Sequence, residues 1–115
     1  MPDFSQVRLR DDRSTERLVD LAMYLQSSSR GFTREEIGKN VPHYNISDND
    51  NFGRMFERDK VELMSIGFDI EVTQADVWNQ DEFRYRIVPN KNLLPALNFT
   101  ESEIRVLVQA TQAWS

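Results

Sequence analysis

At Gly67 the hydrophobic pattern of this chain changes from a helical period to alternation. The apolar residues before the glycine recur at the spacing of one helix face, and they are Phe52, Met55, Phe56, Leu63 and Ile66. Those after it alternate with polar residues in two stretches, and they are Phe68, Ile70 and Val72, then Phe83, Tyr85 and Ile87. The pattern predicts a helix over about 50–66 that leads directly into a β-hairpin, with a tip over 73–82.

Two shorter helical segments precede this junction and one follows it. Apolar residues from Leu18 to Leu25 recur at helical spacing, which predicts a first helix over about 15–29. Thr33 to Glu36 reads Thr-Arg-Glu-Glu, a capping box that opens a second helix ending before Pro42. Asp48 or Asp50 is expected to cap the third helix. A second capping box, over residues 100–103, opens a fourth helix.

The order helix, helix, helix, hairpin, helix predicts a mainly α fold with a small β-hairpin, in the α+β class. It is typical of a winged helix-turn-helix domain with a three-helix core, a two-stranded wing and a C-terminal linker helix. The 115 residues suit one core. We expect a flexible N-terminal arm over 1–13, the winged domain over 14–92, and a linker over 93–115 leading to a further C-terminal domain.

The outer face of the third helix carries the expected DNA-reading residues. Arg54, Arg58 and Val61 lie opposite the apolar face, with the two arginines one turn apart. A guanidinium can bond a guanine edge with two hydrogen bonds or hold a phosphate. We add Asn51 from the same helix to this set. In the alternative interpretation, the arginines form surface ion pairs with nearby glutamates, Glu57 and Glu62.

A second set of residues is expected to contact the DNA backbone beside that helix. These flanking and wing candidates are Thr33, Arg34, Lys60, Arg84, Arg86 and Lys91. Two of them, Arg84 and Arg86, lie on the polar side of the second strand, opposite Asp69 and Glu71 on the first. Cross-strand ion pairs with these carboxylates would occupy both arginines, and the sequence leaves both interpretations open.

Asp59 lies in the middle of the apolar face of the third helix, where an unpaired carboxylate is costly. We expect it to accept hydrogen bonds from a helix N-terminus or an arginine, in a structural role.

The formal net charge of -5 opposes DNA binding, because such domains usually present a basic surface to phosphates. It favours the rival hypothesis, a winged-helix protein–protein interaction or dimerisation module that does not bind DNA. That module would use the fourth helix, whose apolar residues occupy two faces, and Trp78 in the hairpin tip. A salt-sensitive affinity for DNA separates the two hypotheses.

The residues that catalysis or metal binding needs are scarce. The chain has no cysteine, and His43 is its single histidine, so neither a zinc site nor a catalytic dyad is predicted. No glycine-rich phosphate loop is present. We therefore expect no enzymatic activity, no cofactor and no metal.

The N-terminus lacks an apolar signal segment and no stretch is long enough to span a membrane, which predicts a cytoplasmic, nucleoid-associated protein.

The third helix and its surroundings resemble a known family. The segment from Arg54 to Lys60, which reads Arg-Met-Phe-Glu-Arg-Asp-Lys, is followed by Glu-Leu at 62–63 and Gly-Phe at 67–68. It resembles the recognition-helix region of WYL-domain transcriptional regulators of the PafB/PafC branch. The resemblance extends over roughly 14–107, with further matching segments at 16–18, 32–37 and 97–103.

The resemblance implies a winged-helix domain that precedes a WYL domain in actinobacterial transcription regulators, including those of DNA-damage-response genes. It implies a DNA-reading role for the helix that holds Arg54, Arg58 and Lys60, without identifying the bases. The expected partners are double-stranded DNA, RNA polymerase, and a homo- or heterodimer partner bound through the fourth helix and the C-terminal domain.

Overall fold

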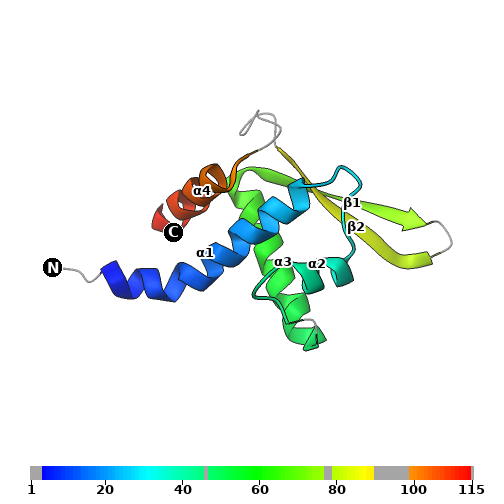
Figure 1. The fold of residues 1–115 in the computed structure, drawn as a ribbon, viewed down its shortest axis with the longest axis horizontal. Coiled ribbons are helices and arrows are strands. Elements are labelled where there is room, and N and C mark those ends of the chain that lie inside the picture. The colour runs from blue at the N-terminus through cyan, green and yellow to red at the C-terminus, as the bar shows by residue number, and fades with distance from the viewer. Residues whose placement is uncertain (1–3, 46, 77–78, 90–98, 115) are drawn as a thin grey trace.

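The computed structural model of this chain describes residues 4–45, 47–76, 79–89 and 99–114. Four helices and a two-stranded antiparallel hairpin make up this described part. In chain order the elements are α1 (Phe4–Gln26), α2 (Arg34–Asn40), α3 (Asn49–Ile66), β1 (Phe68–Asp76), β2 (Asn79–Pro89) and α4 (Glu101–Trp114) (Figure 1). This arrangement confirms the predicted mainly α fold with a hairpin and has the element order of a winged helix-turn-helix.

The helix starts follow from capping chemistry. The Thr33 hydroxyl accepts the Glu36 N–H at 3.2 Å, and the Glu36 carboxylate accepts the Thr33 N–H at 2.9 Å. Thr100 and Glu103 repeat this reciprocal pair at the start of α4, at 3.2 and 2.9 Å. Asp48 caps α3 by accepting a backbone N–H through its side chain. Each cap satisfies backbone donors that have no partner inside the helix, so these predicted starts are confirmed.

Helix α1 begins at Phe4, and not near residue 15 as the sequence predicts. Residues 4–13, expected as an aperiodic arm, are therefore helical. No glycine or proline interrupts the chain between residues 4 and 26, so helix can propagate upstream from the packed turns. Propagation needs no apolar period, which is why the hydrophobic pattern missed this extension. The flexibility of the arm and the domain limits at residues 13 and 92 stay predictions.

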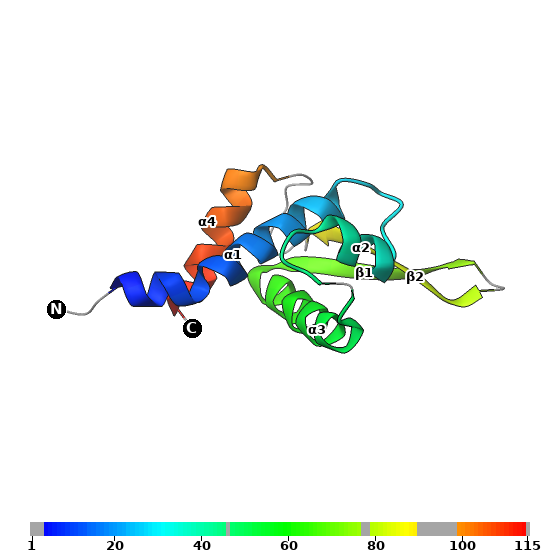
Figure 2. The same cartoon turned by 60° about the horizontal axis from the view of Figure 1, so that its bottom comes forward.

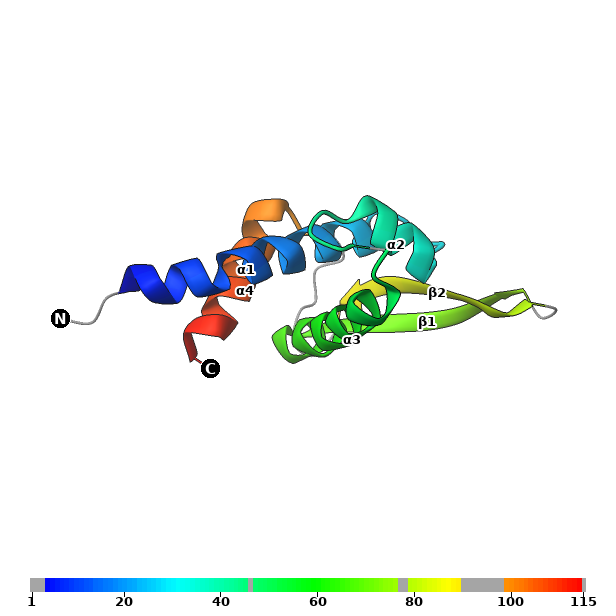
Figure 3. The ribbon, with the colours of Figure 1, turned by 90° about the horizontal axis from the view of Figure 1, so that it is seen from below.

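The hairpin is longer, and its tip shorter, than the alternation predicts. Thr73 pairs with Arg84 and Gln74 with Phe83, and the ladder continues to the pair Asp76 and Asn79. This outer part extends past α2 and α3 (Figure 3). Alternation marks only the part of a strand that has a buried face, whereas backbone pairing continues beyond it.

The core lies where α1, α3 and α4 meet the base of the hairpin, with α4 packed across α1 (Figure 2). Its largest fully buried apolar side chains are Phe52, Phe56, Phe68, Leu18, Leu21, Leu25, Ile37, Leu63, Ile104, Val19 and Val108. Phe32 joins the segment before α2 to the hairpin, because it exchanges two backbone hydrogen bonds of 2.8 Å with Tyr85. Within the described ranges, no helix is long and apolar enough to cross a lipid bilayer.

Candidate nucleic-acid interface

Helix α3 is fixed to the rest of the domain by a buried carboxylate. Asp59 accepts hydrogen bonds from Arg17 Nε at 2.6 Å and Nη2 at 3.0 Å, and from the Tyr44 hydroxyl at 2.6 Å. The Asp59 side chain is 1% exposed and the Arg17 side chain 10%. The expectation that Asp59 accepts from an arginine is therefore confirmed. The three side chains come from α1, from the segment between α2 and α3, and from α3 itself.

The two side chains that donate to Asp59 are held in their protonated forms by their contacts. The hydrogen bond to Asp59 raises the pKa of Arg17 above its ordinary value. Burial, together with the neighbouring Asp59 carboxylate, raises the pKa of the Tyr44 hydroxyl. Both donors therefore keep their protons over the neutral range.

The outer face of α3 presents the residues that the sequence assigns to DNA. Asn51, Arg54, Arg58 and Val61 are all exposed, and Val61 exposes 60% of its surface. Neither Arg54 nor Arg58 has a hydrogen-bond or ion-pair partner among the described residues. Glu57, one of the glutamates offered as an alternative partner, instead pairs with a lysine. Two guanidinium groups one turn apart thus face solvent with their hydrogen-bond donors unused.

Lys60 differs from these arginines because it lies on the core side of α3. Its Nζ is 3.0 Å from Glu57 and lies 5.2 and 5.1 Å from the ring centroids of Phe56 and Tyr85. Only 17% of its side chain is exposed. The ammonium group is therefore engaged within the domain, away from the outer face that carries Arg54.

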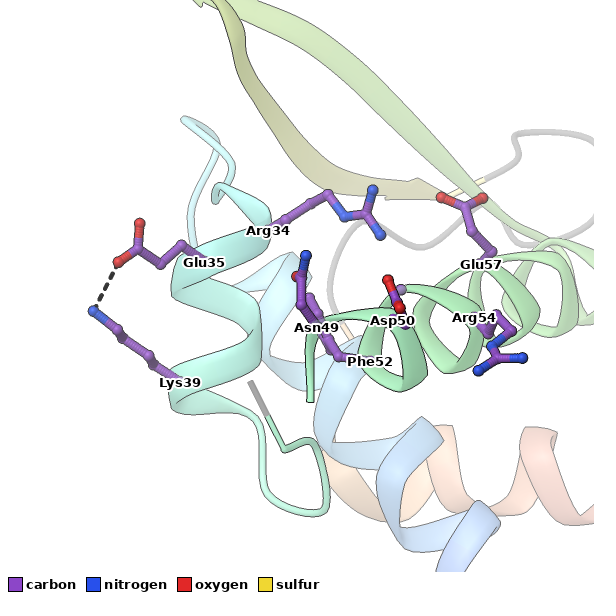
Figure 4. Close-up of a pocket in the computed structure, with 9 residues that line it drawn as sticks. Arg34, Glu35, Lys39, Asn49, Asp50, Phe52, Arg54 and Glu57 are labelled. Carbon is purple, nitrogen blue, oxygen red and sulfur yellow. Dashed lines mark hydrogen bonds and ion pairs between the residues drawn. The ribbon is translucent and has the colours of Figure 1, made fainter. Parts of the chain in front are cut away.

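A groove of about 820 Å³ separates α2 from α3. Figure 4 shows Arg34 extending from α2 across this groove toward α3, whereas Arg54 points outward from α3. The Arg34 guanidinium lies 5.9 Å from the Phe52 ring centroid and 5.6 Å from that of Phe56, within cation–π range. Lys39, at the other end of α2, pairs with Glu35 at 2.9 Å.

The wing arginines are both held by contacts, in two different ways. Arg86 Nη2 lies 2.9 Å from Glu71 Oε1, its directly opposite neighbour in the ladder. This is the cross-strand pair that the alternative interpretation describes. Arg84 lies opposite Thr73, and its Nη1 is 3.5 Å from Glu36. Asp69 is opposite Val88 in the register, so it is not the partner of either arginine across the ladder.

The remaining predicted contacts are less informative. The hydroxyl of Thr33 is occupied in the cap of α2. Lys91 and Trp78 lie outside the described residues. His43 lies 3.9 Å from an Asp20 carboxylate oxygen. Among the residues that the structure describes, no three His, Cys, Asp or Glu side chains are grouped as a metal site would require.

Sequence comparison relates these features to known proteins. Over 100 residues, 86% of its length, the chain is 38% identical to Protein PafB of Mycobacterium leprae. It is 37% identical over the same length to Protein PafB of Mycobacterium tuberculosis. This chain is homologous to PafB. The homology confirms the resemblance noted at the recognition-helix region.

A solved structure of a related protein is also similar to this chain. The structure of Proteasome accessory factor B/C (PafBC) of Arthrobacter aurescens matches 77% of this chain with a TM-score of 0.56 and 35% sequence identity. The matched region is a part of those proteins, because the chain spans about 30% of the length of the curated PafB relatives and 13% of the PafBC chain. It corresponds to their N-terminal portion. No protein-family model matches the chain.

Sequence reasoning missed Tyr44 and the position of Arg34 over the α3 rings. A tyrosine in an otherwise polar connection, close to a helix with one acid on its apolar face, is a usable signal for a buried hydroxyl donor. No comparable signal exists for Arg34, because its contacts depend on how α2 crosses α3.

Proposed function

We propose that this chain is a double-stranded DNA-binding winged helix-turn-helix unit of a bacterial transcriptional regulator. The observation that carries the proposal is the pair Arg54 and Arg58. Both are exposed, lie one turn apart, and have no partner within the described part of the chain. The opposite face of the same helix is fixed by buried aromatic rings and by Asp59.

In the proposed complex, α3 enters the major groove with its outer face toward the bases. Arg54 and Arg58 bond guanine edges or phosphates, and the Asn51 amide has the donor and acceptor that pair with adenine. Val61 would contact a thymine methyl group. The rigid attachment of α3 matters because base contacts tolerate little displacement.

The wing is proposed to lie beside the DNA backbone. Arg86 is engaged by the Glu71 carboxylate and the Ser29 carbonyl oxygen. Arg84 is engaged by the Glu36 carboxylate and the Gly31 carbonyl oxygen. Their expected contribution is smaller than that of Arg54 and Arg58, because a phosphate would compete with these carboxylates.

The net charge of -5 does not exclude this function. The field that a duplex meets depends on the charges of the docking face, and Coulomb interactions with exposed charges more than about 8–10 Å away are largely screened at physiological salt. Acidic residues elsewhere on the surface weaken the non-specific attraction of the chain to DNA. They do not cancel the local positive field of Arg54 and Arg58.

Homology to PafB supports extending the proposal to the whole protein. We propose a cytoplasmic, nucleoid-associated regulator that acts on transcription, including that of DNA-damage-response genes, with RNA polymerase as a partner. A homo- or heterodimer formed through α4 and a C-terminal domain would place two α3 helices on one site.

The proposal is tested by following the amide spectrum of the labelled chain while a random-sequence duplex is added. Signals of Asn51, Arg54 and Arg58 should shift or broaden, and those of α4 should keep their positions.

Shifts confined to α4 would instead favour the protein–protein interaction module. That alternative is supported by Val106 on α4, which exposes 64% of its surface, and by the acidic charge. It predicts self-association that hardly responds to salt.

A further inference from the structure

Gly53 occupies a position in α3 where its own backbone does not require glycine. It lies inside the helix Asn49–Ile66, and the glycines with positive φ are Gly31 and Gly67 within the described ranges. Glycine in a helix interior destabilises it relative to alanine, because glycine loses more backbone freedom on folding. Some feature outside the helix backbone must therefore account for the missing side chain.

That feature is the guanidinium group of Arg34. A Cβ built on Gly53 would lie 3.0 Å from Arg34 Nη2, closer than such atoms normally approach. The same guanidinium lies over the rings of Phe52 and Phe56. Gly53 thus leaves the space in which Arg34 crosses the α2–α3 groove, as Figure 4 shows for the arginine. A substituent here would displace the end of Arg34, which is flexible, without disturbing backbone.

Arg34 in this position is suited to a phosphate. A guanidinium within cation–π range of a ring can still donate its N–H groups to a phosphate. Arg34 has no ion-pair partner among the described residues, whereas Lys39, at the other end of α2, is paired with Glu35. The groove is also lined by Asp50 and Glu57, so an anion is favoured only where it meets the Arg34 edge.

We propose that Arg34 binds a backbone phosphate of duplex DNA and that Gly53 is a positioning residue that keeps its guanidinium over the α3 rings. The inference rests on the proposed function, since the duplex must dock on α3. It adds a contact that fixes the register of the helix on DNA and carries no base information.

The test compares Arg34→Ala, Gly53→Ala, the double variant, Arg34→Lys and a control, Arg13→Ala, which removes a charge from the exposed Arg13 of α1. Affinity for a random-sequence duplex is measured by fluorescence anisotropy over a range of salt concentrations. Arg34→Ala should reduce the slope of log K against log salt by about 0.9, the value for one lost phosphate contact. Gly53→Ala should change the slope in the same direction but by less, because a Cβ displaces the Arg34 guanidinium by only a few tenths of an ångström. The double variant should be no weaker than Arg34→Ala.

Two further readouts separate positioning from a loss of structure. Gly53→Ala should melt at the same temperature as the unaltered chain or above it, since alanine favours the helix. The chemical shifts of the Arg34 side-chain protons should change in Gly53→Ala, because the guanidinium lies near the rings of Phe52 and Phe56. Arg34→Lys should keep a slope close to that of the unaltered chain and bind more weakly, because lysine still neutralises a phosphate but lacks the planar guanidinium fork.

Each contrary outcome has one meaning. Gly53→Ala that binds as tightly as the unaltered chain, while Arg34→Ala does not, overturns the positioning role. Arg34→Ala that binds normally, while Arg54→Ala/Arg58→Ala does not, overturns the phosphate contact and leaves the proposed function standing. An unaltered chain that does not bind duplex overturns the proposed function, and the phosphate contact with it.

Discussion

Arg17 on α1 and Asp59 on α3 form a buried, two-pronged ion pair, with Nε–Oδ2 and Nη2–Oδ1 distances of 2.6 and 3.0 Å. A hydroxyl from Tyr44 completes the coordination of the same carboxylate at 2.6 Å. Hydrophobic contacts alone would let α3 rotate or slide slightly on its aromatic face, whereas a bidentate pair accepts one geometry. The proposed DNA-reading face is thereby directed outward by a contact on the opposite side of the helix.

Asp59→Ala should destabilise the domain strongly, because it leaves the Arg17 guanidinium buried without a counter-charge. Losing one partner of a buried pair costs about 3–5 kcal/mol, and chemical denaturation monitored by circular dichroism measures the change in the free energy of unfolding. Lys39→Ala serves as the matched control, since it breaks an exposed pair with Glu35 and should leave the midpoint almost unchanged. Equal midpoints for both variants would contradict the structural role of Asp59.

Tyr44→Phe should cost about 1.5–3 kcal/mol, the contribution of a hydrogen bond to a charged group. The raised pKa of Tyr44 in the folded protein means that folding favours the neutral hydroxyl. Its contribution to stability is fully present below the unfolded pKa of about 10 and declines as pH rises above that value. In ultraviolet titration, one of the three tyrosines should therefore ionise only as the protein unfolds at alkaline pH.

The titration of Tyr44→Phe provides the control for this assignment. The late, unfolding-linked step should be absent from the titration curve of this variant. A late step that persists in the variant would assign it to another tyrosine and contradict the raised pKa of Tyr44.

Gly31→Ala should destabilise the junction between α1 and the hairpin. Gly31 has a φ of 83°, and a Cβ at this position would lie 3.0 Å from the Tyr85 carbonyl oxygen, the acceptor of the Phe32 N–H. A left-handed backbone costs an L-residue about 1–2 kcal/mol, before any clash is added. Gly53→Ala is the matched comparison because its helical backbone accepts alanine. Thermal melts in which Gly31→Ala is the more stable of the two would refute this argument.

Sequence alone predicted the features of this fold that depend on local chemistry. Both capping boxes, the Asp48 cap and the junction at Gly67 are encoded by residues a few positions apart, so pattern and structure agree there. The buried role of Asp59 followed from one acid on an apolar face, although its partner Arg17 is distant in sequence and was not identified.

The features that the sequence missed depend on tertiary packing or on the absence of a hydrophobic pattern. Helix α1 begins upstream of its apolar helical pattern. The two strands of the hairpin continue past the residues whose polarity alternates. Lys60 shares a motif with Arg54 and Arg58, yet it packs over the rings of Phe56 and Tyr85. The Tyr85 ring belongs to the hairpin, so a helix wheel of α3 alone does not show that the Lys60 side chain contacts it.

The outer face of α3 is proposed to contact DNA through Arg54 and Arg58. Fluorescence anisotropy with labelled duplex DNA, at low and moderate salt, compares the unaltered chain with Arg54→Ala/Arg58→Ala and the charge control Arg13→Ala. Each arginine that makes a bidentate base contact should contribute about 1–3 kcal/mol on a specific site. Salt-sensitive binding should be lost in the α3 variant and retained by the control. Equal affinity of all three proteins would remove α3 from the interface and contradict it.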